Sequence, residues 1–243
     1  MFGSDSVCRE IYNKQIDYGK EEKMEEKIQA RLDELITRYP QLRGEKENIA
    51  QAYEVMADSY AAGGKLLVAG NGGSASDSEH IVGELMKAFV LPRKLPEEYQ
   101  NRLKEADAEL GKELADKLQG ALPAIAVVDH VALSTAYLND VDPMLGFAQQ
   151  VSGYGVEGDV FLGISTSGNS KNVLYACTVA KAKGMKVIGL TGGNGGKLKD
   201  MADVAIVVPE KETFKIQELH LPIYHALCLM LEERSFGGDT IKL

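Results

Sequence analysis

Short apolar runs punctuate this chain, and each of the first four leads into a turn and then into a segment with helical spacing. The runs are KLLVAG at 65–70, AIAVVD at 124–129, DVFLGIS at 159–165, MKVIGL at 185–190 and VAIVV at 204–208. Apolar runs of this length with helices between them are typical of strands buried on both faces of a parallel sheet. We therefore expect an α/β fold in which helices flank a parallel sheet.

The segments between these runs divide the chain further. Residues 1–50 are charged and helix-favouring, and they predict an N-terminal helical extension. Residues 51–243 form the main domain. Within it, residues 91–121 begin with LPRKLPEEY and continue as charged helix formers, so we expect a helical insertion outside the sheet. Further helices are expected at 75–90, 171–183 and 213–233.

Charge and cysteine content restrict the function classes. The 243 residues carry a formal charge of −9. A net negative field repels phosphate polyanions, so we expect neither nucleic acid nor membrane as a partner, although local amides and hydroxyls can still bind a small phosphorylated substrate. The three cysteines lack a CxxC pair, which predicts reduced thiols. The N-terminus lacks a signal-peptide pattern and no apolar stretch reaches membrane-spanning length, so we expect a cytoplasmic protein.

Polar loops follow the predicted strands, at the sheet edge where ligands of parallel sheets bind. The strongest signal is STSGNS at 165–170, which lies between a strand and a helix. Its hydroxyls and the free N–H groups of the helix start can surround a phosphate, favoured by the helix dipole. The alternative is ordinary helix capping, which requires only one such residue. We interpret Ser165, Thr166, Ser167 and Ser170 as a phosphate site.

Two further loops are rich in glycine. GNGGS at 70–74 offers close backbone approach at Gly72 and Gly73 and donors at Asn71 and Ser74, but it is not a dinucleotide-binding fingerprint. TGGNGG at 191–196 is interpreted as a structural turn.

Histidines and a carboxylate supply candidate acid–base and metal chemistry. His80 and Glu84 lie four residues apart, so a helix would place both on one face, within reach of one metal ion. An exposed polar pair is the ordinary explanation of such spacing, and its position one helix after the glycine turn favours a site. On the last predicted helix, His220 and His225 are five apart and cannot share a face. Periodicity does not choose between them.

The strings AGNGGSASDSEHIVGE, GDVFLGISTSGNSKNV, MKVIGLTGGNGGKL and KIQELHLPIYH together resemble the phosphoheptose isomerases of the wider sugar-isomerase (SIS) family. The resemblance runs from about residue 50 to 233, without the insertion. It implies a five-stranded parallel sheet with flanking helices in three layers. It also implies a homotetramer with active sites at subunit interfaces, and a phosphorylated ketose or aldose as substrate.

The resemblance also implies roles for individual residues. Asn71, Gly72 and Gly73 match sugar contacts, Asp129 a substrate-hydroxyl partner, and the STSGNS residues the phosphate cradle. The implied ligands of one Zn²⁺ are His80, Glu84, Gln217 and His225, with Gln217 also a candidate substrate contact. Glu84 and His225 match the catalytic acid–base pair. The choice of His225 over His220 comes from this resemblance alone.

Some residues depart from the family pattern. Lys87-Ala88 stand where an arginine is usual, and an acidic residue is replaced around Phe214. Gln217 and His225 would also lie about 12 Å apart along a straight helix, which makes Gln217 a difficult ligand. Three hypotheses follow: a sedoheptulose 7-phosphate isomerase, an isomerase of another phosphosugar, and a non-catalytic sugar-phosphate-binding regulatory module.

Overall fold

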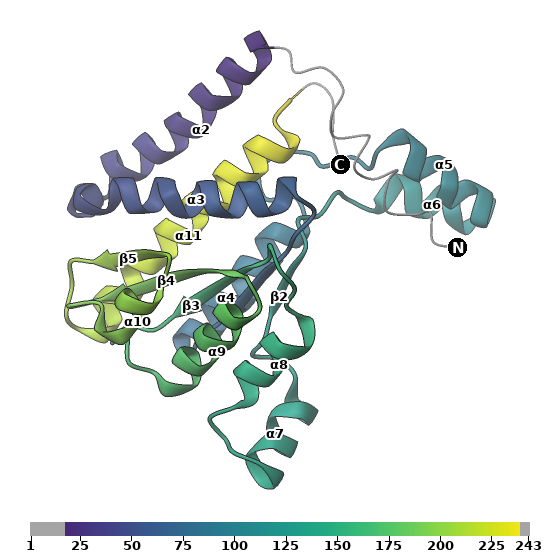
Figure 1. Cartoon of the computed structure of the whole chain (residues 1–243). Coiled ribbons are helices and arrows are strands. Elements are labelled where there is room, and N and C mark those ends of the chain that lie inside the picture. The colour runs from purple at the N-terminus through teal and green to yellow at the C-terminus, as the bar shows by residue number, and fades with distance from the viewer. Residues whose placement is uncertain (1–17, 239–243) are drawn as a thin grey trace.

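Five parallel strands form one sheet in the order β2-β1-β3-β4-β5, as the computed structural model shows (Figure 1). The strands are β1 (Leu66–Ala69), β2 (Ala124–Ala126), β3 (Val160–Ile164), β4 (Lys186–Gly192) and β5 (Val204–Val208). The predicted α/β class and the five-stranded parallel sheet are thus confirmed. The structure describes residues 18–238, with side chains from residue 25. Cys8 and the start of the predicted extension lie outside this part.

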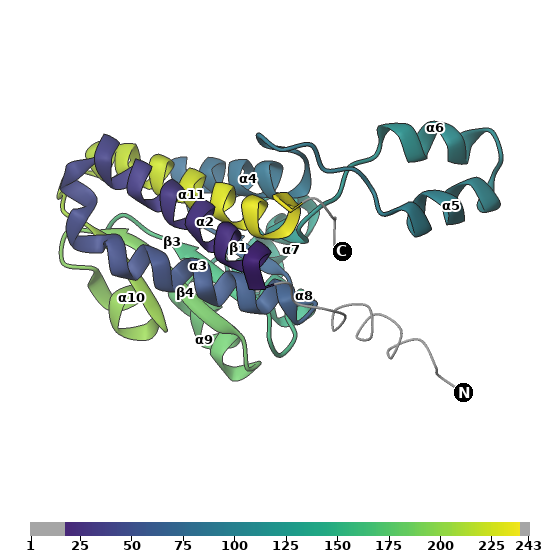
Figure 2. The same cartoon turned by 90° about the horizontal axis from the view of Figure 1, so that it is seen from above.

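Helices cover both faces of the sheet (Figure 2). One layer contains α2 (Tyr18–Arg38), α3 (Lys46–Ala61), α4 (Gly73–Met86) and α11 (Thr213–Phe236), with the short 3₁₀ helix η1 (Pro40–Glu45) between α2 and α3. The other contains α8 (Gly146–Tyr154), α9 (Lys171–Ala182) and α10 (Gly196–Met201). Helix α7 (Val131–Asp140) projects at one end and has no buried residue.

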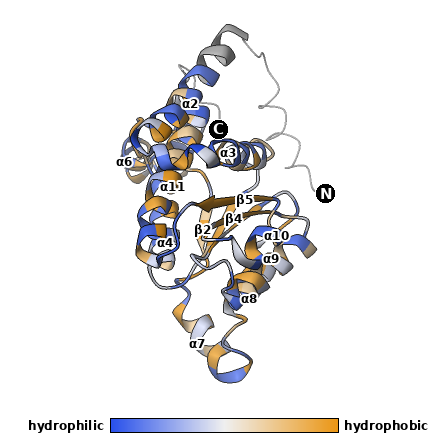
Figure 3. Cartoon of the chain, turned by 90° about the vertical axis from the view of Figure 1, so that its left-hand side faces the viewer, coloured by the Kyte–Doolittle hydropathy of each residue, from blue (hydrophilic) through white to orange (hydrophobic). Residues whose placement is uncertain are grey.

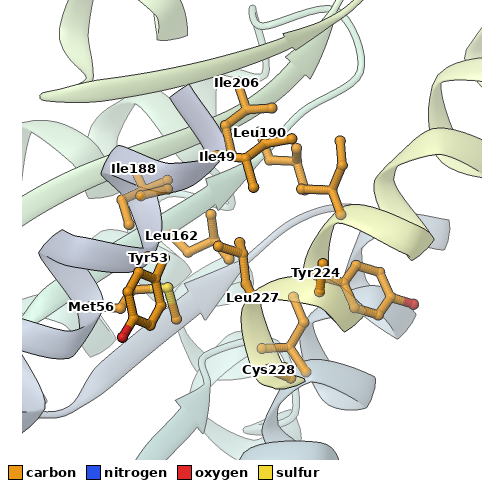
Figure 4. Close-up of a cluster of buried hydrophobic side chains, with 14 of the residues drawn as sticks. Ile49, Tyr53, Met56, Leu162, Ile188, Leu190, Ile206, Tyr224, Leu227 and Cys228 are labelled. Carbon is orange, nitrogen blue, oxygen red and sulfur yellow. The ribbon is translucent and has the colours of Figure 1, made fainter. Parts of the chain in front are cut away.

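Strand residues alternate between two cores. In β3, Leu162 and Ile164 face the α3–α11 side, whereas Phe161 faces α9, as expected for a period of two. Figure 3 shows the strands coloured as hydrophobic between their flanking helices, and Figure 4 shows Ile49 and Tyr53 of α3 against Leu162, Ile188 and Leu227. The predicted domain boundary at residue 50 lies within α3, and α3 packs into the core of the sheet. The boundary itself stays a prediction.

The predicted insertion contains two helices, α5 (Glu97–Ala106) and α6 (Leu110–Lys117), which pack on each other and project from the body (Figure 2). At its base, an isolated antiparallel β-bridge between Lys94 and Gln119 joins the segments that enter and leave the insertion. No helix of residues 18–238 has the length and apolar character to cross a membrane.

Three boundaries, both ends of α4 and the end of β2, differ from expectation. Helix α4 begins inside the expected turn, because Gly72 adopts a φ of +58° that lets the backbone enter the helix at once. It ends at Met86, not Val90, because the backbone N–H groups of Phe89, Val90 and Leu91 bond to the Glu232 carboxylate instead. Strand β2 stops at Ala126, three residues earlier than predicted.

Candidate active site

Three predicted side chains meet between α4 and α11. His80 Nε2 lies 3.2 Å from Glu84 Oε1, and it also lies 3.5 Å from His225 Nε2. His80 and Glu84 reach the same point because they are one turn apart on α4. Helix α11 runs beside α4 and supplies His225 from a segment 145 residues away in sequence.

The distances between these atoms can be compared with the spacing of ligand atoms around a bound metal ion. Two ligands bound tetrahedrally to zinc at about 2.0–2.1 Å lie roughly 3.3–3.4 Å apart. The two distances made by His80 Nε2 agree with that value. The agreement is partial, however, because no group of three His, Cys, Asp or Glu side chains among the described residues forms a complete metal site.

Gln217 does not join this cluster. Its Nε2 lies 2.6 Å from the position that a Cβ on Gly73 would occupy, so the amide sits against the glycine turn. Seven residues separate Gly73 from His80 along α4, a rise of about 10 Å. The amide therefore faces the loop edge of the sheet, whereas the two histidines lie two turns further along the helices.

The two histidines of α11 have different environments. His220 is fully buried, its Nε2 lies 3.3 Å from the Thr191 carbonyl, and burial lowers its pKa to about 4. His225 is partly exposed and faces His80. Burial, followed by the neighbouring His80, lowers the pKa of His225 as well. The question that periodicity left open is thus decided by packing: only His225 lies beside His80 and Glu84.

Neighbouring side chains frame the cluster. The Phe89 ring lies 5.4 Å from the His225 ring, and Lys87 Nζ lies 3.1 Å from Glu84 Oε2. Lys87 therefore supplies a positive charge beside Glu84 where the family pattern has an arginine. The Tyr224 hydroxyl lies 3.0 Å from His80 Nδ1 and 3.2 Å from Asp77 Oδ1. Neither Tyr224 nor Asp77 was predicted from the sequence, although each is within three residues of a predicted histidine.

The STSGNS segment forms a compact polar loop at the start of α9. Ser165 Oγ and Ser170 Oγ lie 2.9 Å apart, and the Ser165 carbonyl accepts from the Gly168 N–H at 2.9 Å. Ser165 is buried, whereas Thr166 and Ser167 are more accessible. Ser170 is the N-cap residue of α9, so the free N–H groups of that helix face the same loop.

The TGGNGG turn supports this loop from behind. A Cβ at Gly168 would lie 1.9 Å from the Gly195 carbonyl oxygen, so the two glycines touch through their backbones. The Leu198 N–H also donates to the Gly168 carbonyl at 2.9 Å. These contacts give the turn a structural role, in agreement with its interpretation from sequence.

The glycine turn adjoins the cradle through two amides. Asn71 Nδ2 donates to Asn172 Oδ1 at 3.0 Å, and Asn172 Nδ2 donates back at 2.8 Å. Asn172 is a further residue that was not predicted from the sequence. Ser74 is buried, and Asp129 is exposed just beyond β2. Asp129 raises the pKa of the Glu79 carboxyl through a side-chain hydrogen bond and through charge repulsion.

Comparison with known proteins places this arrangement in a family. The SIS domain profile matches residues 27–99 and 108–192, and its interruption at 100–107 falls within the α5–α6 pair. The match covers more than half of the chain. The protein therefore belongs to the SIS domain family.

Within that family, several similar proteins are named phosphoheptose isomerase. The phosphoheptose isomerase of Leptospira biflexa is 41% identical over 192 residues, which are 79% of this chain and 86% of that protein. The phosphoheptose isomerase of Aneurinibacillus thermoaerophilus is 38% identical over 195 residues, or 80% and 85% of the two chains. The solved phosphoheptose isomerase from Francisella tularensis superposes with a TM-score of 0.66 at 34% identity, covering 85% of this chain and 96% of that one.

Proposed function

We propose that this chain, a sugar-phosphate isomerase, interconverts sedoheptulose 7-phosphate and D-glycero-D-manno-heptose 7-phosphate. The observation that carries the proposal is that Glu84, His80 and His225 meet on two adjacent helices. His80 Nε2 lies 3.2 Å from Glu84 Oε1 and 3.5 Å from His225 Nε2. The similarity to phosphoheptose isomerases over about four fifths of the chain supports the choice of a heptose.

The residues present can perform the proton transfers of an aldose–ketose isomerisation. The Glu84 carboxylate takes a proton from C1 of the ketose, the electron pair forms the C1–C2 double bond, and O2 gains a proton from His225. His225 then takes the proton of O1 as the C1 carbonyl forms, and Glu84 returns its proton to C2. Each group ends in its starting state, as a catalyst must.

The polar loop would hold the phosphate far from the reacting carbons. The glycine turn touches the cradle through the Asn71–Asn172 pair, and His80 lies about 10 Å further along α4. A phosphate fixed at Ser165, Thr166, Ser167 and Ser170 can thus orient a sugar whose carbonyl end is several carbons away. Such fixation reduces the entropic cost of bringing the reacting carbons and the catalytic groups into the right geometry.

A bound zinc ion is part of the proposal. His80, Glu84 and His225 would hold it, and Gln217 stays a predicted ligand without a contact to them. When bound, the ion would polarise the substrate oxygens that gain charge. The homotetramer with interface active sites and the cytoplasmic location also stay predictions, and light scattering of the purified protein tests the former.

A panel of C5, C6 and C7 ketose phosphates, assayed with and without added zinc after chelation, tests this function. We expect the C7 substrate to have the highest kcat/KM. Activity confined to another phosphosugar would support the second hypothesis from the sequence. Binding of sugar phosphate without turnover of any substrate would support a non-catalytic module and would refute the proposal.

Substitution of the proposed base provides a sharper test. Glu84→Gln should lower kcat by about a hundredfold or more, because the amide cannot accept the carbon-bound proton. Glu47→Gln, an exposed substitution in the first turn of α3, is the matched control and should keep normal activity. A fully active Glu84→Gln enzyme would remove Glu84 from the mechanism.

A further inference from the structure

Tyr224 occupies an unusual position between the core and the candidate active site. Its side chain is only 2% exposed, and its ring borders the apolar cluster while the oxygen points away from it (Figure 4). That oxygen lies between two polar atoms of α4, Asp77 Oδ1 at 3.2 Å and His80 Nδ1 at 3.0 Å. Buried tyrosine hydroxyls usually have a hydrogen-bond partner, but this one contacts two groups that serve different purposes.

The single proton of the phenol decides the direction of both hydrogen bonds. An ionised carboxylate only accepts, so the Tyr224 hydroxyl donates to Asp77. Its oxygen is then left to accept from His80, which requires the proton of the neutral imidazole to be on Nδ1. The opposite nitrogen, Nε2, consequently carries a lone pair toward Glu84 Oε1 and His225 Nε2.

We propose that Tyr224, oriented by Asp77, is a positioning residue that fixes the Nδ1–H tautomer and the ring orientation of His80. The hydrogen bond made by one imidazole nitrogen determines which nitrogen is protonated, and partners of this kind orient the histidines of metal and catalytic sites. The inference deepens the proposed function, because it assigns the group that keeps His80 Nε2 free for a cation.

The competing arrangement is equally specific. Without the Tyr224 hydroxyl, neutral His80 can place its proton on Nε2 and donate to Glu84 Oε1, only 3.2 Å away. In that arrangement His80 Nε2 carries a proton and offers no lone pair, and one oxygen of the proposed base is engaged in the hydrogen bond. Tyr224 therefore acts by excluding this arrangement.

Nitrogen-15 NMR of the histidine side chains in the metal-free protein tests the tautomer directly. The sequence contains only four histidines, so the signals of untagged protein can be assigned with single variants. His80 should be in the Nδ1–H form in the native protein and should change to the Nε2–H form in Tyr224→Phe. His220, whose Nε2 faces the Thr191 carbonyl, should be in the Nε2–H form in both and serves as the internal reference. An unchanged His80 signal would overturn the inference.

Variants of Asp77 and a matched tyrosine separate positioning from stability. Asp77→Asn keeps an acceptor oxygen and should keep the native tautomer, whereas Asp77→Leu should lose it. Tyr53→Phe removes the hydroxyl of another buried tyrosine in the same core and should change nothing at His80. If Asp77→Leu retained the Nδ1–H form, the role of Asp77 would be wrong.

Metal binding gives a second readout. In competition with a chromophoric chelator, Tyr224→Phe should bind zinc about 10- to 100-fold more weakly than the native protein. In the isomerase assay kcat should fall while KM stays within about twofold, because the phosphate cradle is untouched. The tautomer measurement requires neither substrate nor metal, so a protein that fails to turn over heptose phosphate still decides this inference separately. Native zinc affinity in Tyr224→Phe would contradict it.

Discussion

A buried ion pair at the base of the insertion allows a quantitative test of how this site is held. Arg93 and Glu232 are both fully buried, with Nε and Oε1 2.8 Å apart. The same guanidinium donates to the Leu85 carbonyl at 2.6 Å and to the Glu84 carbonyl at 2.8 Å. Arg93 thus fixes the C-terminal turn of α4, which carries the proposed base, and we expect Arg93→Met to be strongly destabilising.

The magnitude follows from what the substitution leaves behind. Removing one partner of a buried ion pair costs about 3–5 kcal/mol, because the other charge remains buried and unpaired. Three backbone N–H groups still bond to Glu232, which reduces the loss. The Glu84 carbonyl loses its donor, which increases the loss by about 1–3 kcal/mol where no water replaces the guanidinium, whereas the Leu85 carbonyl still accepts from the Leu122 N–H. We expect the free energy of unfolding to fall by about 3–5 kcal/mol.

Urea unfolding followed by circular dichroism measures this loss, since the chain contains no tryptophan for fluorescence. Protein concentration must be fixed, because association changes apparent stability. Lys117→Met is the matched control: its partner Glu113 lies 2.5 Å away, but both side chains are more than half exposed, so we expect less than about 1 kcal/mol. Similar losses in the two variants would refute the reasoning. Adding Glu232→Gln to Arg93→Met should recover part of the stability, because it removes the unpaired charge.

Two further predictions concern the loop and the buried histidine. Gly168→Ala should raise KM for the sugar phosphate about tenfold or more, because its Cβ would collide with the Gly195 carbonyl at a φ of +65°. Gly193→Ala, at a φ of +62° with open space around the Cβ, is the control for backbone strain alone, and equal KM values would contradict the prediction. His220 has a folded pKa of about 4, below the value of about 6.5 for an unfolded chain, so the unfolded state binds more protons between these pH values. Stability should therefore fall as pH drops from about 6.5 to 4, by up to about 1.4 kcal/mol per pH unit. His220→Gln should lack this contribution, which urea unfolding at several pH values measures. If the free energy of unfolding fell equally with pH in the native protein and in His220→Gln, the prediction would be wrong.

Strands and polar loops were predictable because their signals are local. A buried parallel strand requires a continuous apolar run, and a phosphate loop after it requires small polar residues, so β3 and STSGNS were identified together. The interpretation of TGGNGG as structural also agrees with its contacts to Gly168. Boundaries were less predictable where distant side chains set them, as Arg93 and Glu232 do at the end of α4.

The choice between the histidines of α11 shows the limit of periodicity. This helix is buried on most sides, under α2 and against the sheet, so its sequence has no polar face that would indicate a direction. By periodicity His220 and His225 were equivalent, and only the family resemblance favoured His225; packing places His220 against Thr191 and His225 against His80. The same packing separates Gln217 from the cluster, which the helical rise had already indicated.

The sequence by itself determined the parallel α/β class, the loops at the strand ends and the pairing of His80 with Glu84 on one helix. Each of these depends on residues within about one helical turn or one strand of each other. Tertiary structure alone decided that His225 meets them and that Tyr224 and Asp77 hold His80. It also decided that Arg93 and Glu232 close the end of α4. These contacts join segments 139 to 147 residues apart, and their geometry is set by how α11 packs against α4, which no local pattern encodes.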